Sequence, residues 1–398
     1  MEDYSSAKLK AYVEVRGGVV SLDLSGKGLS RIPDAVTELT EVEELSLYNN
    51  NLTELPTSIN KLKNLIRLDL IDNILRELPS EIVDLKELRR MDVRKNQLVS
   101  LPASIQKLNQ LEELHLYFNK LTELPSEIGD LKELRRLYVS FNQLVSLPTW
   151  SIQKLNQLEV LHLSGNKLTE LPSEIGDLKE LRRLYVSFNQ LVSLPTSIQK
   201  LNQLEVLHVS GNKLTELPSE IGDLKELRSL NVSYIQLVSL PTSIQKLNQL
   251  EELHLEGNKL TELPSEIGDL KELRSLNLSN NQLVSLPTSI QKLNQLKKLH
   301  LEGNKLTELP SEIGDLKELR SLHVSYNQLV SLPVSIQKLN QLEGLHLEGN
   351  KLTELPSEIG DLKELRRLYV SGNPLSMDAI HVPEMKKKGM THSDITGG

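Results

Sequence analysis

Seven of the nine histidines in this chain occupy the same position of a sequence pattern that returns about every 23 residues. Imidazoles at a fixed spacing can bind a metal ion, exchange protons or stack on aromatic rings, depending on how closely they approach one another. We call this position the central column; its residues are Asp23, Ser46, Asp69, Asp92, His115, Tyr138, His162, Tyr185, His208, Asn231, His254, Asn277, His300, His323, His346 and Tyr369. Histidines that alternate with other residues would lie two strands apart, roughly 10 Å, which is too far for shared coordination. We therefore predict no metal site, and His300, His323 and His346 are the one consecutive run worth testing for a metal.

No other group of residues in the sequence points to catalysis. There is no phosphate-binding loop, no HExxH and no GxSxG, and a chain without cysteine has no thiol nucleophile. The acidic residues recur with the repeat and mostly pair with lysines on an outer face, where ion pairs are solvated and weak. We therefore predict no catalytic residue, no cofactor and no enzymatic activity.

The pattern that carries the central column is LxxLxLxxNxL, and it occurs sixteen times. In residues 122–144, Leu137 and Val139 alternate with surface residues, which predicts a short strand with one buried face. Asn142 follows at a turn, where a buried amide can bond the backbone of adjacent layers. Pro125 forces a change of chain direction, and the SEIGDLKEL stretch after it predicts a short helical or 3₁₀ segment on the outer side.

A repeat of this length cannot bury its own apolar face and must stack on its neighbours. The expected fold is an α/β solenoid with a concave parallel β-sheet and convex short helical or 3₁₀ segments, in about sixteen repeats. We expect an N-terminal cap over residues 1–18, in which Leu9, Tyr12 and Val13 form one face of a short helix. The solenoid then covers residues 19–375, and residues 376–398 form a C-terminal cap and a flexible tail.

Composition narrows the class of partner and the compartment. The chain has 398 residues, a net charge of −8 and no large basic block, so we expect no binding to nucleic acid. No stretch of about twenty apolar residues occurs, so we expect no membrane insertion. The acidic, polar start MEDYSSAKLK is unlike a secretory signal, and the absence of cysteine favours a reducing compartment. We predict a cytoplasmic monomer.

The full repeat, LPxxIxxLxxLxxLxLxxNxL, resembles the leucine-rich repeat family over residues 19–375. It is similar to the intracellular subclass found in Ras-suppressor, Scribble, Erbin and Roco proteins. The resemblance implies a leucine-rich repeat horseshoe that binds proteins, with a role in small-GTPase or kinase signalling. Two units alternate, LTELPSEIGDLKELRRLYVSFNQ and LVSLPTSIQKLNQLEVLHLSGNK, so the true period is about 46 residues.

The concave face is the predicted binding site, because ten of the thirteen aromatic residues and most histidines are expected to line it. Exposed aromatic and arginine side chains on rigid strands are typical of protein interfaces. The candidate residues are His115, Tyr117, Phe118, Arg136, Tyr138, Phe141, His162, Arg183, Tyr185, Phe188, His208, Tyr234, His254, His300, His323, Tyr326, His346 and Tyr369. The alternative is that duplication copied one His and one Tyr many times and each only stacks on its neighbour.

Two further functions remain open at the level of sequence. The chain could be the recognition arm of a larger multidomain enzyme such as a Roco-like GTPase, or a secreted recognition or adhesion protein. Two positions depart from the repeat. Trp150 is an insertion expected at the start of an outer helical segment, and Ile235 replaces the asparagine of the turn.

Overall fold

The computed structural model describes residues 6–375 and builds each repeat around a short strand with a buried centre. From β3 onward the described strands are three residues long, as in β7 (Arg136–Tyr138). Leu137 at the centre of β7 is fully buried, whereas the side chains on either side of it reach the surface. The alternation of the sequence pattern is therefore the alternation of the strand.

The chain divides into two units, Met1–Leu191 and Val192–Gly398. In the first unit the strands are β1 (Val13–Arg16), β2 (Val19–Asp23), β3 (Glu44–Ser46), β4 (Arg67–Asp69), β5 (Arg90–Asp92), β6 (Glu113–His115), β7, β8 (Val160–His162) and β9 (Arg183–Tyr185). From β2 to β9 each strand pairs in parallel with the next, with equivalent leucines opposite each other, as Leu114 is opposite Leu137.

The second unit repeats the arrangement. Its strands are β10 (Val206–His208), β11 (Ser229–Asn231), β12 (Glu252–His254), β13 (Ser275–Asn277), β14 (Lys298–His300), β15 (Ser321–His323), β16 (Gly344–His346) and β17 (Arg367–Tyr369). All neighbouring pairs are parallel and in register. The strands of both units thus confirm the expected solenoid with a parallel sheet.

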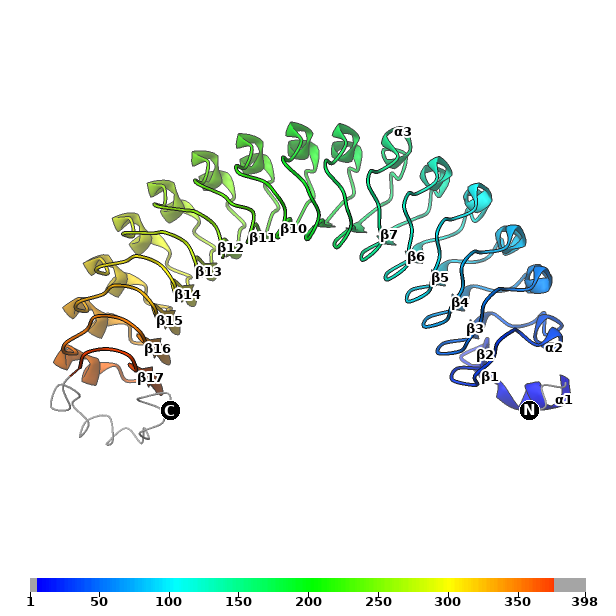
Figure 1. Cartoon of the computed structure of the whole chain (residues 1–398), viewed down its shortest axis with the longest axis horizontal. Coiled ribbons are helices and arrows are strands. Elements are labelled where there is room, and N and C mark those ends of the chain that lie inside the picture. The colour runs from blue at the N-terminus through cyan, green and yellow to red at the C-terminus, as the bar shows by residue number, and fades with distance from the viewer. Residues whose placement is uncertain (1–5, 376–398) are drawn as a thin grey trace. The chain divides into compact units, whose positions relative to one another are not determined.

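Short 3₁₀ turns lie opposite the strands in each unit, on its outer edge (Figure 1). In the first unit they are η2 (Thr57–Lys61), η3 (Ser80–Asp84), η4 (Ala103–Lys107), η5 (Ser126–Asp130) and η6 (Ser173–Asp177), with α-helical turns at α2 (Asp34–Thr37) and α3 (Thr149–Ile152). In the second they are η7 (Thr196–Lys200), η8 (Ser219–Asp223), η9 (Thr242–Lys246), η10 (Ser265–Asp269), η11 (Thr288–Lys292), η12 (Ser311–Asp315), η13 (Val334–Lys338) and η14 (Ser357–Asp361). A proline precedes each of these turns with φ near −65°, because its ring fixes the entry angle and its missing N–H has no partner to lose there. Trp150 lies in α3 and is 76% exposed.

A ladder of asparagines closes each turn after the strand. The side-chain Nδ2 of Asn142 donates to the carbonyls of Leu116 (2.9 Å) and Val139 (3.0 Å), and its Oδ1 accepts the N–H of Leu121 (3.0 Å). These partners belong to both its own layer and the preceding one. Each such amide satisfies backbone groups that the buried turn would otherwise leave without partners.

The first residues of the described chain differ from the expected helix. A short helical stretch does form, in α1 (Ser6–Leu9) and η1 (Lys10–Tyr12), and Leu9 is fully buried. Val13, however, begins β1, which pairs antiparallel with β2 through Gly17 and Gly18 at positive φ. The glycine pair makes a hairpin here. The expected cap and tail over residues 376–398 lie outside the described residues.

Candidate functional site

The central column of the first unit forms a stack of rings at the ends of β6 to β9. The ring centroids of His115 and Tyr138 are 4.4 Å apart, those of Tyr138 and His162 are 5.0 Å apart, and those of His162 and Tyr185 are 3.9 Å apart. This stack follows from strand geometry, since neighbouring parallel strands lie about 4.8 Å apart. Tyr117 joins it from the side, with its centroid 5.4 Å from Tyr138.

His115 is the most enclosed ring of this stack. It is 7% exposed, so it offers little surface to a partner. Its Nε2 lies 3.3 Å from Glu113 Oε2, and its Nδ1 lies 3.9 Å from Asp92. Burial lowers the pKa of His115 below its usual 6.5, and the two carboxylates oppose that shift without cancelling it. The other histidines of the candidate set are half-buried.

Arginines and carboxylates beside the stack are paired with each other. Glu113 lies between Arg90 (3.1 Å) and Arg136, and Arg94 lies 3.0 Å from Asp92. Burial alone would raise the pKa of Glu113, but its hydrogen bond with His115 and the charges of Arg136 and Arg90 together lower it. This charged border is therefore compensated within the protein, and the apolar rings are what remains for a partner.

A second row of aromatic residues lies in the turns that follow the strands. We call Phe118, Phe141, Phe188, Tyr234 and Tyr326 the turn row. Their exposed fractions run from 47% for Phe141 to 70% for Tyr326. Phe118 and Phe141 stack with parallel planes and centroids 4.6 Å apart. The sequence pattern predicted these residues as outward strand positions, but each lies beyond the end of its strand.

All five turn-row residues have left-handed backbone conformations, with φ between 53° and 56°. This region is uncommon for bulky residues, because the Cβ crowds the following carbonyl at a cost of roughly 1–2 kcal/mol. Other repeats place glycine at the same position, for example Gly165, Gly257 and Gly349. Those glycines also make room: a Cβ on Gly165 would lie 2.6 Å from the ring of Phe141. The large side chains are thus retained at a strained position where a glycine would fold more easily.

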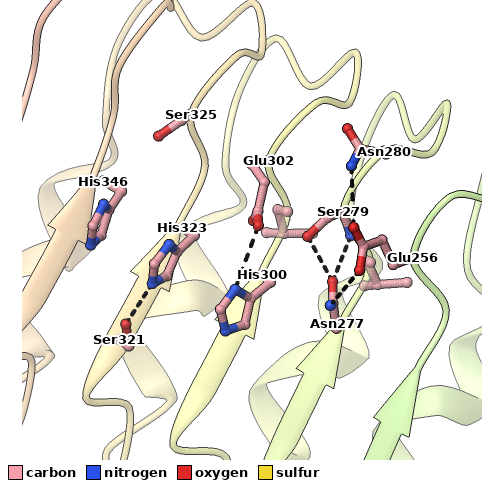
Figure 2. A network of polar contacts seen from close by, with 12 residues as sticks. Glu256, Asn277, Ser279, Asn280, His300, Glu302, Ser321, His323, Ser325 and His346 are labelled. Carbon is pink, nitrogen blue, oxygen red and sulfur yellow. Dashed lines mark hydrogen bonds and ion pairs between the residues drawn. The ribbon is translucent and has the colours of Figure 1, made fainter. Parts of the chain in front are cut away.

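The central column of the second unit ends in a run of histidines on β14, β15 and β16. The ring centroids of His300 and His323 are 4.3 Å apart, and those of His323 and His346 are 3.9 Å apart (Figure 2). The ring of Tyr369 follows, with its centroid 4.5 Å from that of His346. Burial and the neighbouring His346 and His300 lower the pKa of His323 to about 4. Burial would raise the pKa of Glu302, but its hydrogen bonds, the strongest of them with His300, and the charge of His300 together lower the pKa to about 2. At neutral pH this stack therefore combines an uncharged imidazole with an ionised carboxylate.

A polar hollow of about 490 Å³ lies at the start of the first unit, on the strand side of β1 to β5. It is lined by charged residues that include Arg67, Asp69, Arg90 and Asp92. Burial raises the pKa of Asp69. None of these residues was in the predicted site, although the excess of arginine in these repeats was visible in the sequence.

Six exposed valines also lie outside the predicted site. Val99, Val145, Val192, Val238, Val284 and Val330 are 53–61% exposed. They follow the asparagine turn in alternate repeats, so within each unit a repeat without such a valine separates one from the next. Single exposed apolar side chains of this kind are common and need no functional explanation.

The repeat geometry and the ladder define a leucine-rich repeat protein. The family model described as "Leucine-rich repeat region" matches residues 22–148, 253–324 and 290–385. A second model, "Leucine rich repeat", matches residues 132–191, 180–237 and 202–260. The chain belongs to the leucine-rich repeat family. Members of this family are typically non-catalytic interaction scaffolds.

Solved structures show the same fold in bacterial and plant proteins. A leucine-rich repeat protein of Leptospira interrogans is 39% identical, with 97% of each chain covered and a TM-score of 0.91. The plant peptide hormone receptor RGFR1, solved in complex with RGF2, is 32% identical over 92% of this chain and 64% of the receptor, with a TM-score of 0.74. The Arabidopsis receptor kinase HAESA, in complex with the peptide hormone IDA and the co-receptor SERK1, is 26% identical over 92% of this chain and 72% of that chain, with a TM-score of 0.62.

No curated protein sequence matches the chain. Among the described residues, no helix has the length and apolar character needed to cross a membrane.

Proposed function

We propose that this protein is a non-catalytic scaffold that binds a protein or peptide partner on its strand side, through the aromatic residues of the first unit. The turn row is the observation that carries the proposal. Phenylalanines at φ of 53–55° cost folding energy, and these three residues are 47–63% exposed. Strained and exposed residues of this kind occur mainly at functional sites.

The central column and Tyr117 beside it supply the adjacent surface for that partner. Tyr117, Tyr138 and Tyr185 lie beside the turn row, with Arg136 and Arg183 on the same strands. Tyrosine and arginine are enriched among the residues that carry binding energy in protein interfaces, and phenylalanine is enriched in the buried centre of interfaces. The two plant receptors named above were both solved with peptide hormones, which supports a peptide or protein as the class of ligand.

The test is a binding comparison between two double variants of the full chain. Phe141→Ala with Phe188→Ala removes two exposed rings, and Val99→Ala with Val145→Ala removes two equally exposed apolar side chains outside both aromatic rows. Partners captured by the wild-type chain are then titrated against each variant. We expect the phenylalanine variant to lose about 2 kcal/mol or more of binding free energy and the valine variant to bind normally.

The opposite ranking, with loss of the partner only in the valine variant, would place the interface at the valines and contradict the proposal. Circular dichroism of both variants separates lost binding from lost folding. Neither substitution removes a buried side chain, so large stability losses are not expected.

We further propose a cytoplasmic location and a monomeric chain that serves a small-GTPase or kinase signalling assembly. The LPxxIxxLxxLxxLxLxxNxL form and the absence of cysteine support this part of the proposal. Cell fractionation tests the cytoplasmic location. The mass of the native protein in solution tests whether the chain is a monomer. Recovery outside the cell would favour the alternative of a secreted recognition or adhesion protein, and attachment to a GTPase domain would favour the Roco-like alternative.

A further inference from the structure

Three repeats of the second unit carry the sequence His-Leu-Glu at the end of the strand, at His254, His300 and His346. The strands before the first two of these, β11 and β13, end in Asn231 and Asn277. The strand before the third, β15, ends in His323 instead. This single exchange of asparagine for histidine places three imidazoles side by side.

The exchange also brings together a set of metal-ligand atoms. One ligand atom each from His300, Glu302 and His323 lie within 4.8 Å of one another, and all three side chains are half-buried. The distance from His300 Nδ1 to Glu302 Oε1 is 3.6 Å (Figure 2). Two ligands on one tetrahedral zinc ion are about 3.3 Å apart, given Zn–N and Zn–O distances near 2.0–2.1 Å. The pair of His300 and Glu302 is therefore close to the required separation.

One ring nitrogen of His323 is engaged by a residue of its own strand. Its Nε2 lies 2.8 Å from the hydroxyl of Ser321, which leaves Nδ1 for a metal ion (Figure 2). Histidines that bind metals usually engage their second nitrogen in such a hydrogen bond, which fixes the tautomer and the ring. Ser321 belongs to the same strand as His323, so the contact is built into β15.

The second carboxylate oxygen of Glu302, beside the Oε1 that faces His300, has no donor among the described residues. This atom, Oε2, is buried, and no described donor lies in hydrogen-bond geometry with it. The neighbouring hydroxyl of Ser279 donates to Asn277 Oδ1 at 2.6 Å instead. A buried carboxylate oxygen without a donor is costly and is rare in native proteins. A cation between Glu302 and the two imidazoles would remove that cost.

The equivalent glutamate two repeats earlier shows the contrast. Glu256 accepts the hydroxyl of Tyr234 at 2.5 Å and the side-chain amides of Asn277 and Asn280 at 3.4 and 3.5 Å. Neutral donors thus satisfy this carboxylate, and one of them is the asparagine that His323 replaces. The repeat that has lost the asparagine is the one whose glutamate keeps an oxygen, Oε2, without a donor among the described residues.

We propose that His300, Glu302 and His323 form a binding site for a divalent transition-metal ion of the zinc class. Two imidazole nitrogens and one carboxylate are a ligand set that zinc accepts, with water or a partner's side chain completing the coordination. A ring binds a metal in its own plane, whereas His300 and His323 are stacked with planes only 20° apart. Binding therefore turns one imidazole out of the stack, which makes the site weaker than a preformed one.

The test uses Zn²⁺ alone as the probe and the full, untagged chain after treatment with a chelator. Isothermal titration should show one saturable site in the wild-type protein, and Co²⁺ should give a visible absorption band from a site with nitrogen ligands. His323→Asn copies the arrangement at Asn277 and should weaken binding at least about tenfold. His254→Asn, which changes the same column outside the cluster, is the matched control and should bind as the wild type does.

Three results would overturn the proposal: no saturable site, equal affinity in the wild type and His323→Asn, or loss of binding only after replacement of His381 and His392, which lie outside the described residues. Circular dichroism checks that His323→Asn remains folded. Glu302→Gln is a second variant, which removes the carboxylate and should also weaken Zn²⁺ binding. These readouts do not involve the binding partner, so they stand apart from the test of the proposed scaffold function.

Discussion

The asparagine of the turn determines the backbone conformation of its own layer. The backbone differs in the two layers that lack this asparagine. Lys27 and Ile235 occupy the asparagine position. In both layers the next residue has a positive φ, 66° at Gly28 and 65° at Gln236. In both layers the backbone N–H of the replacing residue donates to the side-chain Oδ1 of the asparagine in the following layer. The distance is 3.1 Å from Lys27 to Asn50 and 3.2 Å from Ile235 to Asn258. Glycine adopts this conformation freely, but glutamine does not.

Ile235→Asn should therefore stabilise the protein. The N–H of Leu214, which stands where the pattern places the donor to this side chain, makes no hydrogen bond among the described residues. An asparagine would accept it and would let Gln236 leave the left-handed region. We expect the free energy of unfolding to rise by about 1–3 kcal/mol, the cost of a buried donor left without a partner. Urea unfolding measures the change.

Val238→Asn is the control for this substitution, because it adds the same amide at a side chain of the same repeat that is 54% exposed. Its effect should stay within about 0.5 kcal/mol, as for most surface substitutions. If Ile235→Asn is no more stable than the wild type, water already accepts the hydrogen bond of the Leu214 N–H, and the prediction is wrong.

The strands and 3₁₀ turns were predictable from sequence because their cause is local. Leucines at period two and a proline before each turn determine which residues are buried, and stacking follows from the repeat. The positive φ of the turn row was not predictable, since the pattern gives the direction of a side chain and not its backbone conformation. The burial of His115 was not predictable either, because it depends on Asp92 and Glu113 in neighbouring positions.

The alternation of two repeat types also has a cause that only the packing reveals. Gly129 in η5 faces the carbonyl of Ser151 in the next repeat, and a Cβ at Gly129 would lie 2.2 Å from that oxygen. Gly222 meets Ser243 in the same way. On the turn side, the ring of Phe141 lies against Gly165. Each repeat type thus fits the other, so the period of about 46 residues has a steric basis.

The stability of the first unit should depend on pH, because His115 at the end of β6 has a lowered pKa. Burial holds the folded-state pKa of His115 below 6.5 although Asp92 and Glu113 raise it and Arg90 lowers it further. The unfolded chain therefore takes up a proton first as the pH falls. The contribution of the neutral ring to stability is complete above about pH 6.5 and is lost progressively below it. His115→Gln should reduce this decline in the free energy of unfolding between pH 7 and pH 5.

The measurement is urea unfolding at several pH values, with the titration of the His115 ring followed by NMR as an independent readout. Parallel pH profiles for the wild type and His115→Gln would contradict the prediction. So would a ring that titrates at or above pH 6.5 in the folded protein.

Stability in a repeat chain is close to a sum of layers and of contacts between nearest neighbours. A weak layer then lowers protection locally instead of lowering it everywhere, and a chain of this length does not unfold in one step. The layer of Ile235 combines the strained Gln236 with the unpaired N–H of Leu214, so it should be the weakest interior layer of the second unit. Amide hydrogen exchange along the whole chain can locate it.

We expect residues 210–258 to exchange faster than the layers on either side of them in the wild-type protein. Ile235→Asn should slow exchange across this segment and leave residues 22–148 of the first unit unchanged, because coupling fades over a few layers. The comparison separates two descriptions of the molecule. If one substitution slowed exchange equally from the first strand to the last, the chain would unfold as a single cooperative body, and the sum over nearest neighbours would fail. A change confined to the layers around Ile235 would show that each repeat owes its stability to the repeats it touches.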